Sequence, residues 1–281
     1  MKSAAFDLHQ PSNVAAALQL LANAEQSVKV MGGGQSLGPM LNLRLAQPEV
    51  LVHVARLPEM LTAKMDGDSL LMGAGVTHAS IEDGLVPDVT RGLMPYVAAN
   101  IAYRAIRNRG TIGGSLAHAD PAADWVNTMM LLGASMQITS LDAQGASEAT
   151  GQQREVVAHA FMQGPFTTAL ADNEILTAIR IPVLSSSARW GYYKFCRKTG
   201  EFAEAIGGVL SDPERGIHRV LIGATDNVPI VIHDAKALIN ASDSASITRI
   251  LHDAGMAADP YAFKMHHTAL IRAIAMLHQQ A

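Results

Sequence analysis

Two short glycine-rich turns contain the residue types of this chain that are best suited to chemistry. Residues 32–36 (GGGQS) directly follow a predicted strand. Residues 111–115 (TIGGS) form a second glycine turn, which has a hydroxyl side chain at each end. Because glycine has no Cβ, such a turn lets the backbone approach a ligand closely, and successive N–H groups can form a nest for an anion. Two nests suit a ligand with two linked phosphates. Either turn alone is weak evidence, because two glycines after a strand more often form only an ordinary tight turn.

Neither turn matches a common nucleotide-binding motif. The chain has no GxGxxG dinucleotide fingerprint and no GxxxxGK(S/T) phosphate loop. A third glycine segment at 73–75 (GAG) also follows a predicted strand, and we interpret it as a structural turn. The prediction of a ligand therefore depends on the two turns acting together.

A single cysteine limits the metal chemistry of the chain. Cys196 cannot form an internal disulfide, and alone it cannot hold an iron–sulfur cluster or a zinc ion. His266 and His267 have no cysteine or acidic cluster beside them, so we expect no metal ligands here. Any iron–sulfur centre that works with this chain must lie on another one.

Longer segments around the turns resemble a known family. Residues 30–54 (VMGGGQSLGPMLNLRLAQPEVLVHV) resemble the first flavin-binding segment of the FAD-binding subunit of molybdenum hydroxylases, the xanthine dehydrogenase and carbon monoxide dehydrogenase family. Residues 106–124 (IRNRGTIGGSLAHADPAAD) resemble its second flavin-binding segment. Residues 192–210 (YYKFCRKTGEFAEAIGGVL) resemble the start of its C-terminal domain. The similarity covers nearly the whole chain, including its length and the order of its segments.

The resemblance implies that the ligand is FAD and that both glycine turns hold its pyrophosphate. Asp124, Leu176 and Lys194 fall where the family places flavin contacts. Tyr193 is placed to pack near the isoalloxazine ring, and Ile101 to lie near the adenine. The cofactor-binding residues implied in this way are Gly32, Gly33, Gly34, Gln35, Ser36, Leu37, Thr111, Ile112, Gly113, Gly114, Ser115, Asp124, Leu176, Tyr193 and Lys194.

Four residues depart from the usual pattern of the family. Gly32 stands where alanine is common, and Gln35 where many members have histidine. Asn42 replaces a common lysine, and Ser115 replaces a common asparagine or aspartate. All four keep small size or hydrogen-bonding capacity, so they concern fine tuning and subfamily more than flavin binding.

The resemblance also implies a role in electron transfer. In the family, a molybdenum cofactor on a large subunit hydroxylates the substrate, and 2Fe–2S clusters on a small subunit carry the electrons onward. FAD on a chain of the present type passes them to an external acceptor such as NAD, a quinone or another carrier. The implied partners are these two subunits, in a dimer of heterotrimers. We therefore expect an oxidoreductase subunit without a catalytic acid or base of its own, since the flavin carries the redox chemistry.

Two other functions remain open at this point. The chain would be a stand-alone FAD oxidoreductase with its own substrate pocket if it turned over a substrate by itself. It would be a non-catalytic assembly subunit if it bound FAD without passing electrons. Stand-alone flavin enzymes of this kind are usually longer, and some attach the flavin through histidine or cysteine, which this sequence does not clearly position.

Several of these residues also have a purely structural interpretation. Asp124 suits the first turn of a helix, Lys194 a solvated strand position and Tyr193 a core position. Three arginines around the second turn could contact a phosphate or a partner subunit, although we expect at least two of them simply to face solvent: Arg104, Arg107 and Arg109.

The composition is that of a folded protein without a nucleic-acid footprint. The 281 residues are 49% hydrophobic and 16% charged, which is enough apolar material for a core, and the formal net charge is −4. The N-terminus has no apolar signal segment, and no apolar run approaches the roughly 18 residues of a membrane span. We expect a soluble cytoplasmic protein.

The elements that must position the turns form an α+β pattern. Helices are predicted at 12–24 with Ser12 as N-cap, at 94–108, from Asp120 onward and at 261–280, and Thr77 is predicted to cap a short helix. Strands are predicted at 28–31, 51–54, 69–76, 135–140, 154–157, 174–182, 190–197, 205–210 and 218–224, and a polar turn at 142–149.

These elements predict two domains. Residues 1–175 form an FAD-binding domain of two α/β subdomains, about 1–58 with a small parallel sheet and 59–175 with a larger mixed or antiparallel sheet. Residues 176–281 form a C-terminal domain of antiparallel strands and helices.

Overall fold

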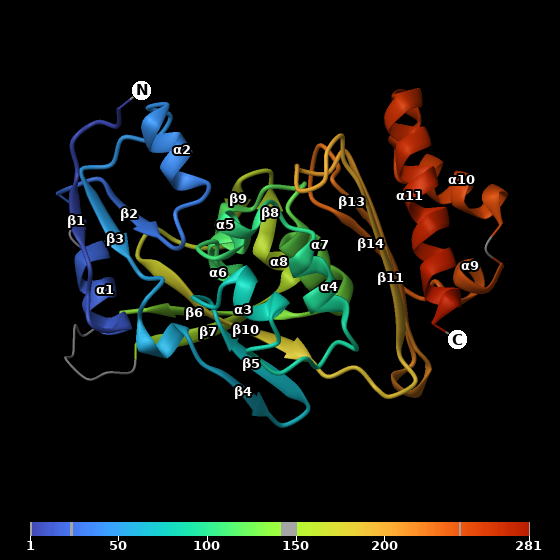
Figure 1. The fold of residues 1–281 in the computed structure, drawn as a ribbon, viewed down its shortest axis with the longest axis horizontal. Coiled ribbons are helices and arrows are strands. Elements are labelled where there is room, and N and C mark those ends of the chain that lie inside the picture. Colours follow the sequence, from blue (N-terminus) through green and yellow to red (C-terminus); the bar gives the residue numbers. More distant parts are fainter. Residues whose placement is uncertain (1, 23–24, 142–150, 242, 281) are drawn as a thin grey trace.

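The computed structural model describes residues 2–22, 25–141, 151–241 and 243–280, and it contains three main β-sheets (Figure 1). The first sheet has the order β1-β3-β2, and all its strand pairs are parallel. Its elements are β1 (Asp7–His9), α1 (Val14–Leu21), β2 (Val28–Met31), α2 (Leu37–Asn42) and β3 (Val50–His53), followed by the 3₁₀ turn η1 (Pro58–Met60).

The second sheet has the order β4-β5-β10-β6-β7, and all its strand pairs are antiparallel. Its strands are β4 (Ala63–Asp66), β5 (Ser69–Gly73), β6 (Ser135–Ser140), β7 (Gln152–Val157) and β10 (Glu174–Pro182). The helices of this region are α3 (His78–Glu82), α4 (Leu93–Ala99), α5 (Arg104–Arg107), α6 (Ile112–His118), α7 (Asp124–Leu132) and α8 (Ala158–Phe161), and a small hairpin joins β8 (Met162–Gly164) to β9 (Thr167–Thr168).

The third sheet is antiparallel, with the order β11-β12-β13-β14. Its strands are β11 (Arg189–Phe195), β12 (Ala205–Asp212), β13 (Ile217–Gly223) and β14 (Ile230–Ile232), with the 3₁₀ turn η2 (Pro213–Arg215) after β12. The chain ends in α9 (Lys236–Ala241), α10 (Ser244–Asp253), η3 (Met256–Ala258) and α11 (Pro260–Gln279). The three sheets confirm the predicted α+β class.

The third sheet lies between α7 of the FAD-binding region and α11. Glycines on two adjacent strands bring α11 close: a Cβ on Gly191 would lie 1.8 Å from the carbonyl oxygen of Ala273, and one on Gly207 would lie 2.6 Å from that of Ala269. On the other face, Gly208 meets the side chain of Leu131 in α7. Figure 1 shows α11, α9 and α10 on the outer side of this sheet. Among the described residues, no helix combines the length and the apolar character that crossing a membrane requires.

Two predicted helix starts differ from the structure because of local capping, and a third agrees with it. Asn13, not Ser12, accepts the capping hydrogen bond of α1, from the backbone N–H of Ala16. Asp120 caps a turn by accepting from the N–H of Ala122, and α7 begins only at Asp124. The predicted Thr77 cap of α3 is confirmed, since the Thr77 side chain accepts from the Ser80 N–H.

The predicted helix at 94–108 is two helices. It breaks between α4 and α5, where Ala102 has a left-handed φ of 42°. Hydrogen bonds from Arg107 to the carbonyl oxygens of Ile101 and Ala102 stabilise the chain at this break. The predicted turn at 142–149 lies outside the described residues.

The predicted domain boundary after residue 175 falls inside β10. This strand pairs with β5 on one side and β6 on the other, so it is the central strand of the second sheet. Sheet pairing therefore separates the two regions after Pro182 rather than at residue 175.

Candidate flavin site

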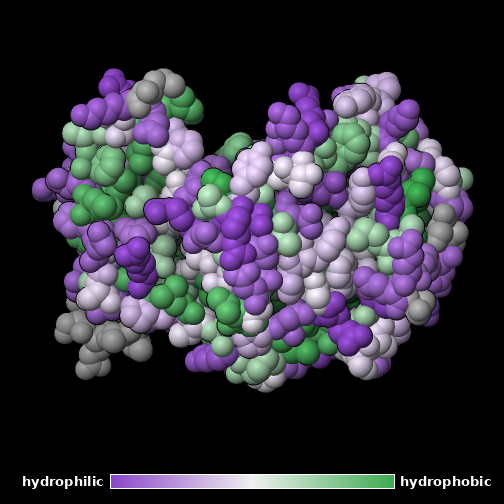
Figure 2. Space-filling model, viewed as in Figure 1, coloured by the Kyte–Doolittle hydropathy of each residue, from purple (hydrophilic) through white to green (hydrophobic). Residues whose placement is uncertain are grey.

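The two glycine turns, far apart in sequence, are in direct contact. A Cβ added to Gly32 would lie 2.9 Å from Thr111 Oγ1 and 3.5 Å from Gly114 Cα. One added to Gly33 would lie 1.8 Å from the carbonyl oxygen of Arg109. The first two glycines are therefore required for the close approach of the two backbones. Figure 2 shows the surface hollowed above this region, between the N-terminal lobe that carries α2 and the C-terminal lobe.

The first turn has the properties of an anion cradle. It follows β2 directly, and Gly34 has a left-handed φ of 74°. Within the described chain, the backbone N–H groups of residues 32–37 donate to no protein acceptor. The hydroxyl of Ser36 likewise has no hydrogen-bond partner there, while Gln35 Nε2 donates to the Gly33 carbonyl. These consecutive unpaired donors are partly exposed and are ready to bind phosphate oxygens.

The second turn does not form a nest of its own. It is the first turn of α6, with Thr111 as N-cap. The N–H groups of Ile112 and Gly113 donate to the carbonyls of Val76 and Ala74, and those of Gly114 and Ser115 donate to Thr111. The expectation of a second set of inward amides is therefore wrong, because these donors close the helix cap and a link to the strand end instead.

The two glycines of this second turn face different surroundings. Gly113 is buried, and a Cβ there would lie 2.4 Å from the Ala74 Cβ. Gly114 is partly exposed, and a Cβ there would lie 3.9 Å from Gly32 Cα and 4.0 Å from the Gly33 nitrogen. Gly113 thus serves packing, whereas Gly114 keeps the space in front of the first turn open.

Positive charge gathers beside the first turn. His53, at the end of β3, is paired with Met31 just before the turn. Burial lowers the pKa of His53, and the charges of Arg56 and Arg109 lower it further. Both arginines are exposed, and their field favours an anion at the turn. His53 and Arg56 carry no motif signal, and only the parallel pairing of β2 and β3 brings them here.

A buried ion pair joins the FAD-binding region to the third sheet. Lys194 Nζ lies 2.8 Å from Asp124 Oδ2, and the two side chains are only 9% and 7% exposed. Tyr192 donates to the other carboxylate oxygen at 3.2 Å, and Lys194 also donates to the Asn100 carbonyl. Burial raises the pKa of Asp124, although the neighbouring ammonium opposes this shift. The structure thus brings the predicted residues Asp124 and Lys194 together.

Tyr193 is not brought to this group. Successive side chains of a strand alternate between faces, and both neighbours of Tyr193 contact Asp124. Tyr193 therefore lies on the α11 face, where Arg272 is 4.7 Å above its ring. Its predicted position beside a flavin ring is not supported by this geometry.

Two other predicted contacts lie in apolar surroundings. The Leu176 side chain, in β10, is buried in the core next to the β-bulge of that strand. Ile101 is partly buried in the break between α4 and α5. Within the described chain, no hydrogen bond links either residue to the glycine turns.

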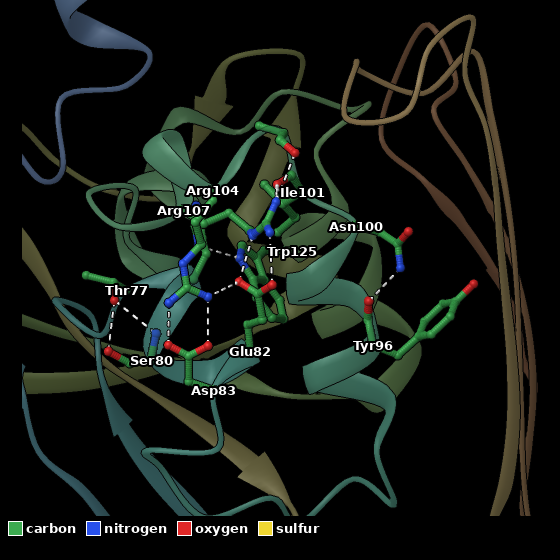
Figure 3. A network of polar contacts seen from close by, with 12 residues as sticks. Thr77, Ser80, Glu82, Asp83, Tyr96, Asn100, Ile101, Arg104, Arg107 and Trp125 are labelled. Atoms are coloured by element: carbon green, nitrogen blue, oxygen red, sulfur yellow. Dashed lines mark hydrogen bonds and ion pairs between the residues drawn. The ribbon is translucent and has the colours of Figure 1, made fainter.

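The arginines before the second turn divide into two kinds (Figure 3). The side chain of Arg104 is 49% exposed and pairs with Glu82 of α3 and with Asp83 just after it, whereas that of Arg107 is 12% exposed and pairs with Glu82. Arg109 is exposed. Two of the three therefore face solvent, while Arg107 is part of the interior.

The buried side chain of His78 packs against Gly110, directly before the second glycine turn. His78 Nδ1 accepts a hydrogen bond from Trp125 Nε1 at 2.9 Å, and a Cβ on Gly110 would lie 2.7 Å from His78 Nε2. Burial lowers the pKa of His78 to about 4, with a further contribution from the charge of Arg107. Its partner Trp125 is 47 residues away, which explains why no local pattern indicated this contact.

This histidine predicts a specific dependence of stability on pH. Between pH 6.5 and about 4 the unfolded chain binds a proton that the folded chain does not, so stability is complete above pH 6.5 and is lost as the pH falls. The loss should approach about 3 kcal/mol near pH 4. Urea unfolding at pH 7 and pH 4.5 measures it. His78→Gln, which keeps an acceptor for Trp125, should show a smaller pH dependence, and equal slopes for both proteins would contradict the assignment.

Comparison with known proteins shows which family the chain resembles. Residues 4–184 match the family model of the FAD binding domain in molybdopterin dehydrogenase. The chain is 33% identical to the nicotine 6-hydroxylase medium subunit of Paenarthrobacter nicotinovorans, over 97% of this chain and 93% of that protein. It is 34% identical to the carbon monoxide dehydrogenase medium chain of Hydrogenophaga pseudoflava, over 81% of this chain and 76% of that protein.

Solved structures agree. A chain of carbon monoxide dehydrogenase from Oligotropha carboxidovorans superposes with a TM-score of 0.85 at 28% identity, over the full length of both chains. The present chain therefore belongs to the FAD-binding subunits of the molybdopterin dehydrogenases. Within that family it is of the medium-subunit type, an oxidoreductase subunit with FAD as its own cofactor.

Proposed function

We propose that this chain takes electrons from 2Fe–2S clusters on a partner chain and passes them to an external acceptor. The relatives named medium subunit or medium chain support an assembly with a large and a small subunit. We propose the molybdenum cofactor on the large subunit and the iron–sulfur clusters on the small one, in a dimer of heterotrimers. The observation that carries the proposal is the first glycine turn, whose backbone N–H groups at residues 32–37 are unpaired within the described chain.

The residues present fit an FAD molecule. The amides of residues 32–37 would bind its pyrophosphate, and the cations beside them would offset its charge. Gly114 leaves room for the phosphates, while the Asp124–Lys194 pair provides polar groups between the FAD-binding region and the third sheet. When bound, the flavin supplies the redox chemistry, accepting electrons from a one-electron donor and releasing them in pairs. The chain itself would bind the FAD, orient its flavin ring and shield it from solvent.

The proposal predicts that the chain carries electrons but cannot start the reaction. Purified chain should bind FAD non-covalently, and denaturation should release it intact. Mixed anaerobically with a candidate substrate (carbon monoxide, a purine, an aldehyde or an N-heteroaromatic compound), the FAD-loaded chain should keep its flavin absorbance. Adding the two partner subunits should allow the substrate to bleach it.

The control is chemical reduction. Flavin reduced by dithionite on the isolated chain should still pass electrons to an artificial acceptor. Rapid bleaching by substrate without the partner subunits would overturn the relay and favour a stand-alone oxidoreductase. Failure to pass electrons to the acceptor would instead favour an assembly subunit.

A further inference from the structure

The break between α4 and α5 is held from two opposite sides. From the third sheet, Lys194 Nζ donates to the Asn100 carbonyl at 3.2 Å, and a Cβ on Gly200 would lie 2.8 Å from the Ala102 carbonyl oxygen. From the FAD-binding region, Arg107 Nη1 donates to the carbonyls of Ile101 and Ala102, each at 3.0 Å. Residues 100–102 thus form a link between the two regions.

Arg107 is committed to this link with all of its nitrogen atoms (Figure 3). Its Nε and Nη2 donate to the two carboxylate oxygens of Glu82 at 2.7 and 2.9 Å, while Nη1 serves the two carbonyls. The hydrogen bonds from Arg107 also keep the pKa of the Glu82 carboxyl below its usual value. A planar guanidinium with fixed donor directions can satisfy all these acceptors at once, which an ammonium cannot do.

The same residue is directly connected to the glycine turns. It ends α5, and the N–H groups of Arg109 and Gly110 both donate to the carbonyl of Ile106, its chain neighbour. The backbone of residues 109–110 is the surface on which Gly33 packs. Arg107 therefore connects two structural features. One is the contact between the two glycine turns, and the other is the Asn100 carbonyl to which Lys194 donates.

We propose that Arg107 is a positioning residue of the flavin site. It fixes residues 100–102, of which Ala102 has the left-handed φ, and thereby sets the distance between the glycine turns and the Asp124–Lys194 pair. It does not contact the ligand itself. The inference rests on the proposed binding of FAD at the first glycine turn, and it adds that the environment of the flavin depends on this guanidinium.

Arg104 provides a matched control. It lies one turn earlier on the same helix and pairs with Glu82 and Asp83, but its side chain is 49% exposed. Its hydrogen bonds go to those two carboxylates alone in the described chain, and none reaches a backbone carbonyl of the link. Replacing either arginine with lysine removes the same chemical group and keeps the charge.

The experiment compares Arg107→Lys with Arg104→Lys in the full chain. FAD is titrated into each apoprotein, and the visible absorption and fluorescence of the bound flavin are recorded together with circular dichroism. Arg107→Lys should weaken FAD binding by about tenfold or more and alter the flavin spectrum, because displacements of about 1 Å in a positioned site have effects of this order. Arg104→Lys should bind within about twofold of the unmodified chain, as is usual for exposed ion pairs.

A second variant, at the partner of Arg107, tests the inference independently in case Arg107→Lys fails to fold. Glu82→Gln retains the shape of the anchor but removes its charge, and it should change the flavin spectrum in the same direction by a smaller amount. The inference is overturned if the unmodified chain binds FAD and if Arg107→Lys and Glu82→Gln both match it in affinity and flavin spectrum. Equal losses in the two lysine variants also overturn it. Absence of FAD binding by the unmodified chain would instead refute the proposed function.

Discussion

Gly114→Ala should weaken FAD binding by up to about a hundredfold while the fold survives. The added methyl would lie 3.9 Å from Gly32 Cα and 4.0 Å from the Gly33 nitrogen, directly before the unpaired amides. Forcing a group into a filled site costs about 1–3 kcal/mol, which corresponds to roughly ten- to a hundredfold in affinity. Its closest protein contact is the Thr111 hydroxyl at 2.8 Å, which caps α6 and must shift to admit the methyl, so we also expect a modest loss of stability, which the helix preference of alanine offsets in part. FAD titration and thermal unfolding of the apoprotein measure both effects.

The adjacent glycine is the control for this prediction. The same substitution at Gly113 would press against the Cβ and backbone of Ala74 in the core, at 2.4 to 2.9 Å. Gly113→Ala should therefore lower the melting temperature, and the molecules that remain folded should bind FAD more tightly than Gly114→Ala does. Unchanged affinity in Gly114→Ala would show that the phosphates do not lie before the first turn.

Lys194→Met should destabilise the chain by about 3–5 kcal/mol, because it leaves a buried carboxylate without its counter-ion. Lys194 and Asp124 are 2.8 Å apart, and both are almost fully buried. With the ammonium gone, only the hydrogen bonds to Asp124, one of them from Tyr192, still oppose the effect of burial, and the pKa of Asp124 rises further. The folded state then binds a proton more readily than the unfolded state, so the deficit should shrink as the pH falls.

The double variant Lys194→Met/Asp124→Asn separates charge from packing. The asparagine can still accept a hydrogen bond from Tyr192, which donates to this position at 3.2 Å. The double variant should recover most of the lost stability in urea unfolding, and its pH dependence should lack the contribution of Asp124. A double variant as unstable as the single one would show that the lysine stabilises the chain by packing and not by its charge.

The fold was predictable where burial and local pattern coincide. The predicted strands at 28–31, 135–140 and 174–182 agree with β2, β6 and β10 to the residue. Helix ends were less predictable, because Ser12 and Asp120 have the right side chains for caps but a neighbouring residue or turn is used instead. The break at Ala102 depends on Arg107, whose acceptors are set by the tertiary fold.

The site was predictable only in part. The sequence identified both glycine turns, but not that the second uses its amides internally, since their acceptors lie partly at the distant Ala74 and Val76. The surroundings of Tyr193 were not predictable, because adjacent strand residues face opposite sides, and the packing of α7 and α11 decides which of these side chains meets Asp124. The supports His78 and Arg107 have partners 47 and 25 residues away, beyond any local motif.

The central position of β10 has a consequence for the order of assembly during synthesis. Its neighbours β5 and β6 end at residues 73 and 140, but the strand that joins them is completed only at residue 182. A chain emerging from the ribosome would therefore expose two unpaired strand edges for more than thirty residues of translation, several seconds at roughly 5–20 residues per second. Gly113 donates to Ala74, and Ala74 in turn donates to Thr177 of β10, so we expect insertion of β10 to complete the support of the second glycine turn. We therefore expect flavin capture to follow the insertion of this strand.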